Sequence, residues 1–168
     1  MRFLVFTFLG IYSIVSAQSF PKDWLGTYDG KMCVASRGSE QTIAVSLTIN
    51  TIKKDSSWTY LMTYNAPTGK LKKNYIIRKE PDGNFTLDEG GLLIPLLFSN
   101  SCFYDHYVLD SMYFNSVLSY RRRGRLEFNL YGGSQTMTNA RKSNQEGTTI
   151  SAYLPSFSQR ALLKRRKK

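Results

Sequence analysis

Apolar and polar residues alternate along most of this chain. In residues 42–50 every second side chain is a branched apolar one, and the positions between them are polar or small. A period of two places the apolar residues on one face of an extended segment, which predicts a half-buried β-strand. The pattern returns at residues 57–64 after a short polar link, so we expect a hairpin. The apolar positions of these two strands are Ile43, Val45, Leu47, Ile49, Trp58, Tyr60, Met62 and Tyr64.

The chain continues as a series of short alternating segments. Turn signals such as Pro81-Asp82-Gly83 and Gly90-Gly91 separate them, and helix signals are nearly absent. Residues 132–149 are rich in Gly, Ser, Thr, Asn and Gln without an apolar period, which predicts a long loop before a closing strand at 150–163. Further strands are predicted at residues 70–79, 84–88, 91–99, 102–109, 112–122 and 125–131.

Sequential hairpins with one polar face favour an all-β, antiparallel up-and-down barrel over a sandwich. We expect about 8 to 10 strands. Closing the barrel would pair the first strand with the last and remove the exposed edges of the sheet. The predicted organisation is one barrel domain at residues 18–163, preceded by a leader at 1–17 and followed by a basic tail at 164–168.

The first residues have the composition of a secretory signal peptide. Arg2 precedes an apolar run at residues 3–15, and Val15-Ser16-Ala17 supplies the small residues of a cleavage site. The run is shorter than the ~20 residues that a membrane-spanning helix needs. The sequence therefore predicts a signal peptide at 1–17 and a secreted or periplasmic protein.

The chain is basic, with 23 Lys and Arg against 12 Asp and Glu and a net charge of +11. Positive residues concentrate at 121–125 and at 164–168. Aromatic residues alternate with the apolar set, so we expect them in the core and expect no specific nucleic-acid binding. The charge predicts instead weak attraction to anionic surfaces or polymers.

The segment Trp24-Leu25-Gly26-Thr27-Tyr28 resembles the first strand of lipocalin-like, or calycin, barrels. In that family a Trp near a Gly begins the first strand, and a basic residue of the last strand packs over the indole. Arg160 is the candidate for that partner here. Trp24, Gly26 and Tyr28 would share one strand face, with Trp24 closing one barrel end.

Residues 22–165 also resemble uncharacterised secreted proteins of Bacteroidetes. The likeness rests on the W-x-G-x-Y start, on Asp88-Glu89 ahead of a strand, and on the basic ending that begins at Gln159-Arg160-Ala161. It implies the same exported, lipocalin-like barrel.

Inward-facing residues of such a barrel are candidates for a ligand site. The predicted function is non-enzymatic binding of a small apolar or amphipathic ligand; the cofactor is unknown. An envelope- or surface-associated interaction module, acting through its basic tail and loops, is the alternative. The candidate ligand-binding residues are Trp58, Tyr60, Met62 and Phe128, with Tyr104 and His106 as polar contacts, beside Ile43, Val45, Leu47 and Leu130 as further inward positions.

Candidate chemistry is sparse. His106 is the only histidine, which excludes a zinc site with several histidines, and no G-x-S-x-G motif occurs. Cys102 and His106 would lie ~13 Å apart along a strand, too far for a catalytic pair. No catalytic residue and no metal site is predicted. Resemblance to barrel haem proteins of the nitrobindin type makes His106 a candidate axial haem ligand, the simpler interpretation being an exposed strand histidine. Cys33 and Cys102 are either a disulfide or two buried thiols.

Overall fold

The computed structural model describes residues 20–136, 140–145 and 148–167. The described residues form thirteen strands and no helix. No helix of this part of the chain is therefore long and apolar enough to span a membrane. The predicted signal peptide lies outside the described residues. The strands are β1 (Gly26–Ser36), β2 (Ser39–Ile49), β3 (Thr51–Lys53), β4 (Ser57–Ala66), β5 (Gly69–Lys79), β6 (Phe85–Glu89), β7 (Leu92–Ser99), β8 (Cys102–Leu109), β9 (Met112–Arg121), β10 (Arg125–Ser134), β11 (Ala140–Gln145), β12 (Thr148–Tyr153) and β13 (Phe157–Arg165).

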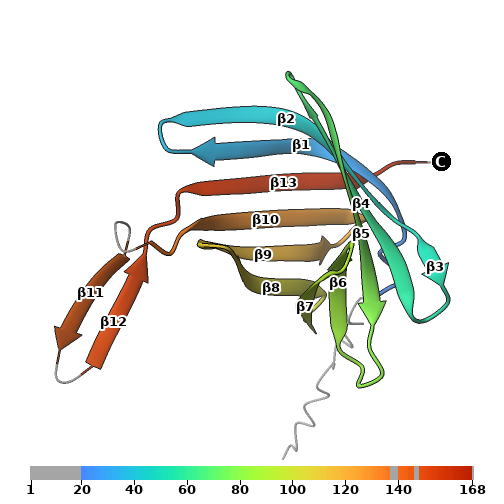
Figure 1. Cartoon of the computed structure of the whole chain (residues 1–168). Coiled ribbons are helices and arrows are strands. Elements are labelled where there is room, and N and C mark those ends of the chain that lie inside the picture. Colours follow the sequence, from blue (N-terminus) through green and yellow to red (C-terminus); the bar gives the residue numbers. More distant parts are fainter. Residues whose placement is uncertain (1–19, 137–139, 146–147, 168) are drawn as a thin grey trace, which may run out of the picture.

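Ten of these strands close into an antiparallel barrel (Figure 1). Their order around the wall is β2-β1-β13-β10-β9-β8-β7-β6-β5-β4, and the pairing of β2 with β4 closes the ring. The short strand β3 pairs only with β4, beyond the end of β2. Strands that follow one another in the chain lie side by side around most of the wall. The predicted all-β, antiparallel up-and-down barrel is therefore confirmed.

The segment between β10 and the closing strand differs from the prediction. β11 and β12 form a separate two-stranded sheet that projects away from the barrel in Figure 1, where a loop was expected. Periodicity detects a strand only when one of its faces is apolar, and residues 140–149 have no apolar period, so the sequence gives no signal for this hairpin. The closing strand β13 starts later than expected and includes Lys164 and Arg165, which were assigned to the tail.

One end of the barrel is filled by aromatic rings. Phe20, ahead of the first strand, lies with its ring centroid 4.7 Å from Trp58 and 4.9 Å from Phe103. Trp24 lies in the turn before β1, fully buried, with its centroid 5.3 Å from Phe103. Phe85 and Phe98 complete this aromatic end. The edge-on geometry of most of these contacts is the one that aromatic quadrupoles favour.

The basic partner of the first strand is Arg165 and not Arg160. Two guanidinium nitrogens of Arg165 donate to the Tyr28 hydroxyl at 2.7 and 3.2 Å, and Nη2 also donates to the Asp23 carbonyl. The Tyr28 hydroxyl in turn donates to the Trp24 carbonyl at 2.8 Å. Arg160 faces outward, where it pairs with Glu127 at 3.1 Å. The expected contact between Trp24 and Arg160 is wrong because Ala161 and Leu163 occupy the inward positions of β13, which turns Arg160 to the outside.

The first and last strands approach each other closely at Gly30. A Cβ built there would lie 2.3 Å from the Leu162 carbonyl oxygen and 2.9 Å from the Leu163 side chain. Only glycine fits this closing pair of strands without displacement of the backbone.

The two cysteines are separate thiols. Cys33 Sγ lies 3.2 Å from Glu40 Oε1 and Cys102 Sγ lies 3.2 Å from Ser119 Oγ. The choice left open by the sequence is settled against a Cys33–Cys102 disulfide in this structure, although neither thiol is fully buried.

Candidate functional site

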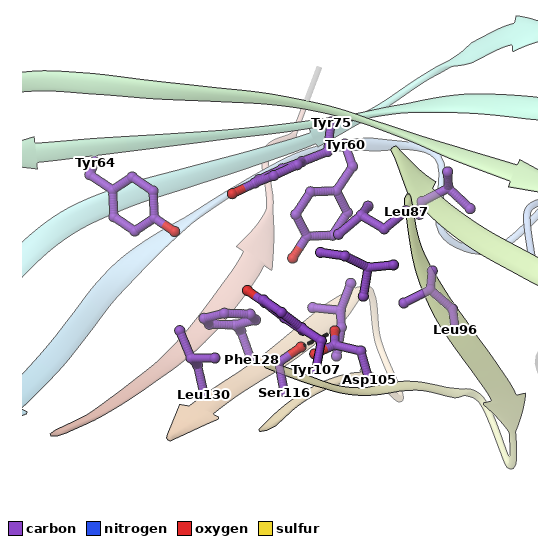
Figure 2. Close-up of a pocket in the computed structure, with 13 residues that line it drawn as sticks. Tyr60, Tyr64, Tyr75, Leu87, Leu96, Asp105, Tyr107, Ser116, Phe128 and Leu130 are labelled. Atoms are coloured by element: carbon purple, nitrogen blue, oxygen red, sulfur yellow. Dashed lines mark hydrogen bonds between the residues drawn. The ribbon is translucent and has the colours of Figure 1, made fainter. Parts of the chain in front are cut away.

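A cavity lies inside the barrel, between the aromatic end and the opposite end. Its volume is about 90 Å³. A cavity needs only ~10–15 Å³ to hold a single water, so this one admits several waters or one small organic group. Seven strands supply its wall (Figure 2). The lining residues are Tyr60, Tyr64, Tyr75, Ile77, Leu87, Ile94, Leu96, Asp105, Tyr107, Ser116, Leu118, Phe128 and Leu130.

Four tyrosines give the cavity most of its polar character. Figure 2 shows the hydroxyls of Tyr60, Tyr64, Tyr75 and Tyr107 directed toward a common space from β4, β5 and β8. Burial raises the pKa of Tyr64 and of Tyr107 to about 12, and it raises the pKa values of Tyr60 and Tyr75 as well. All four are therefore neutral at physiological pH and can both donate and accept hydrogen bonds.

Asp105 is the charged group of the cavity. It points inward from β8 and is paired in register with Ser116 of β9. Its Oδ2 accepts a hydrogen bond from Ser116 Oγ. Its Oδ1 is buried and has no hydrogen-bond partner among the described residues. Burial raises the pKa of Asp105 above its usual value, although the hydrogen bond from Ser116 acts in the opposite direction.

The sequence placed some of its candidates inside and others on the wrong face. Tyr60, Phe128 and Leu130 line the cavity. Trp58 and Met62 are buried but do not line it; Trp58 belongs to the aromatic end. Ile43, Val45 and Leu47 of β2 are likewise buried in the core without lining the cavity.

The inward orientation expected for Tyr104 and His106 is wrong. Both side chains are exposed on the outer face of β8, and His106 Nδ1 lies 2.7 Å from Asn115 Oδ1 of the neighbouring strand. Phe103, Asp105 and Tyr107 hold the inward positions of this strand. His106 is thus not placed to ligate a haem held inside the barrel, which removes the basis of that interpretation. Groups of three or more metal-ligating side chains are also absent from the described residues.

Strands β7 and β8 are paired with each other over only part of their length. Only three residue pairs join these strands, all next to the connecting turn, whereas β1 and β2 are joined by eleven. Beyond Leu97 and Tyr104 the two strands run on without pairing to each other. Leu96 and Asp105 line both the cavity and a groove on the outside at this point. The cavity wall here is therefore made of side chains that also face the outer groove.

Asp105, Tyr64, Tyr75 and Tyr107 were not among the ligand-binding residues predicted from the sequence, although Tyr64 was placed on the same strand face as Tyr60. β8 carries aromatic residues on both faces, so alternation alone does not select the inward one. The neighbouring strand β9 decides which face of β8 is inward, because its inward residues Leu118 and Ser116 pair with Phe103 and Asp105. This information requires the register between the two strands, which the sequence alone does not show.

Comparisons with known proteins define the fold but no family. No protein-family model matches the chain, and no curated protein matches it. Among solved structures, the chain is similar to the S-type phycobiliprotein lyase of Guillardia theta, with a TM-score of 0.62. The two share 8% sequence identity over 88% of this chain and 90% of the lyase chain. At this identity the likeness shows the fold alone, a lipocalin-like closed barrel. The resemblance to secreted proteins of Bacteroidetes finds no support here and stays a prediction.

Proposed function

We propose that this barrel binds a small ligand with an apolar or aromatic body and at least one polar group, in the cavity between the four tyrosines and Asp105. The observation that carries the proposal is the convergence of four tyrosine hydroxyls and a half-buried carboxylate on a space whose remaining walls are apolar except for Ser116. Small-molecule sites combine apolar surface with a few convergent polar groups in this way. The likeness to a lyase barrel is compatible with this proposal but supplies none of its chemistry.

We infer binding and not turnover from the groups that the cavity presents. Its described lining contains four tyrosine hydroxyls, one carboxylate and one serine, Ser116, whose hydroxyl donates to that carboxylate; no histidine, lysine or cysteine of the described residues lines the cavity to complete a nucleophilic site. The proposed role is that of an exported binding protein, which rests on the predicted signal peptide.

The proposal is tested by native mass spectrometry of the protein purified from its natural host. We expect a bound small molecule that is released on denaturation. Leu130→Trp, which places a large ring in the cavity wall, should abolish the extra mass. Leu162→Trp, on the outer face of the adjacent strand, should retain it. A wild-type protein that carries no small molecule, or equal retention by both variants, would contradict interior binding.

A basic groove beside the aromatic end favours a second candidate, association with anionic surfaces. Arg123, Arg165, Arg166 and Lys167 line it. Arg165 is engaged with Tyr28, and Arg166 forms an ion pair with Asp29 at 2.8 Å, so removal of the whole tail would also disturb the barrel. Arg123→Gln with Lys167→Gln is the cleaner change. It should abolish salt-sensitive binding to anionic vesicles if this candidate is correct, and leave cavity binding unchanged.

A further inference from the structure

We propose that the cavity selects ligands in which a protonated amine is attached to an aromatic or apolar body, with Asp105 as the residue that recognises the nitrogen. This inference rests on the proposed function and names the chemical class of its ligand. It follows from the unpartnered oxygen of Asp105, from the absence of positive charge in the described cavity wall, and from the tyrosine rings opposite.

One oxygen of the Asp105 carboxylate lacks a hydrogen-bond donor within the described protein. Ser116 satisfies Oδ2 only, and Oδ1 is buried without a donor. A buried carboxylate oxygen without a hydrogen bond carries a large desolvation cost, so a donor that enters the cavity gains more there than at the surface. A hydrogen bond between an ammonium group and a carboxylate is among the strongest that such a ligand can form.

The positive charge must come from the ligand. None of the described residues that line the cavity is a lysine, arginine or histidine. His106, the neighbour of Asp105 in the chain, has its ring on the outer face beside Asn115. Lys73, on the same face of β5 as Tyr75, does not line the cavity and is paired with Glu89 at 2.9 Å. A carboxylate without a cationic partner among the described lining residues favours cations and repels anions of the same shape.

The tyrosines suit the remainder of such a ligand. Tyr60 and Tyr75 stand edge to face, with ring centroids 5.8 Å apart, and contribute aromatic surface to the wall opposite Asp105. Aromatic faces attract organic cations and pack well against a second ring. The cavity of about 90 Å³ restricts the class to small molecules. A cavity of about 150 Å³ takes one benzene, so one ring with a short amine arm is the largest body that we expect, and it requires side chains of the wall to move aside.

Three probes of matched shape separate the contributions of charge and of shape. They are 2-phenylethylamine, which is cationic, 2-phenylethanol, which is neutral, and 3-phenylpropanoate, which is anionic. Titration calorimetry at pH 7.5 should show the wild-type protein binding the amine at least about tenfold more tightly than the alcohol, since a charged hydrogen bond contributes roughly that much. The anion should bind most weakly.

Variants of Asp105 assign the selectivity to this residue. Asp105→Asn should reduce amine affinity at least about tenfold and bring it level with that of the alcohol. Asp110→Asn is the matched control, because Asp110 is exposed in the turn at the end of the same strand, and it should bind like the wild type. Far-ultraviolet circular dichroism checks folding. If Asp105→Asn does not fold, Asp105→Leu makes the same test without leaving a polar group in the wall.

The outcomes separate this inference from the proposed function. Equal binding of the amine and the alcohol by the wild type, unchanged in Asp105→Asn, would overturn the amine selectivity while the cavity stands as a ligand site. A tighter complex with the anion would overturn it as well. If none of the probes binds and protein from the natural host carries no small molecule, the proposed function itself fails.

Discussion

Trp24 provides a quantitative test of the aromatic end. Its side chain is 0% exposed. The centroid of its ring lies 5.7 Å from that of Phe20, 5.3 Å from that of Phe103 and 5.6 Å from that of Tyr120. Trp24→Ala removes this buried surface and leaves a cavity, so the free energy of unfolding should fall by about 3 to 5 kcal/mol. Trp24→Phe should cost only about 1 kcal/mol, because a ring remains and the lost Nε1 has no hydrogen-bond partner among the described residues.

Urea unfolding followed by circular dichroism measures both variants, since Trp58 would complicate a fluorescence assay of single-site changes. For a chain of this size the Ala variant should melt roughly 6 to 20 °C below the wild type. Tyr131→Ala is the control, because this exposed tyrosine of β10 should change stability by no more than about 0.5 kcal/mol. A loss below about 1 kcal/mol in Trp24→Ala would refute the account of this end.

Three further predictions follow from single contacts. Arg165→Ala should lower the free energy of unfolding by about 1 to 2 kcal/mol, a value discounted because the side chain is largely exposed, whereas Arg160→Ala should cost less than about 0.5 kcal/mol; the reverse order in urea unfolding would restore Arg160 as the partner. The affinity for 2-phenylethylamine should be highest at pH values above the raised pKa of Asp105 and fall as the pH decreases through that pKa, because the protonated amine favours the ionised carboxylate. The facing Tyr60, Tyr75 and Tyr107 stay neutral in this pH range, and the His106 ring lies on the outer face. An affinity that does not change with pH in calorimetry would argue against the carboxylate as the recognition group. Those amide hydrogens of residues 92–96 and 105–109 that point toward the unpaired stretch between β7 and β8 should exchange faster than the amide hydrogens of β1 and β2, and equal protection would contradict the interrupted pairing of β7 with β8.

Strand prediction from the sequence succeeded where one face of the strand is polar throughout. In β2, Ile43, Val45, Leu47 and Ile49 alternate with polar or small residues, and all four are buried. A single consistent face leaves only one way to turn the strand toward the core. The barrel itself followed from a run of such strands joined by short turns.

Assignment of the inward face was unreliable where both faces carry large residues. In β8 the set Tyr104 and His106 competes with Phe103, Asp105 and Tyr107, and only the register with β9 decides between them. β13 posed the same problem with Arg160 and Arg165, where the inward Ala161 and Leu163 fix the orientation. These choices depend on contacts between strands distant in the chain, which local periodicity does not contain.

The cavity could not be predicted because it is a property of the assembled wall. Its four tyrosines come from β4, β5 and β8, and the sequence shows nothing that brings Tyr64 and Tyr75 opposite Tyr107. Whether large inward residues fill a ten-strand barrel or leave space depends on their packing together. Here they fill the aromatic end and leave the opposite side open around Asp105.

A crystal structure of the protein with 2-phenylethylamine tests the central claim most directly. We predict the ring between the tyrosines, and the amine nitrogen about 2.8 Å from Asp105 Oδ1. Crystals of Asp105→Asn grown with the same concentration of 2-phenylethylamine should show no amine in the cavity. An amine found only on the outer surface, with the cavity closed by side chains, would contradict ligand binding inside this barrel.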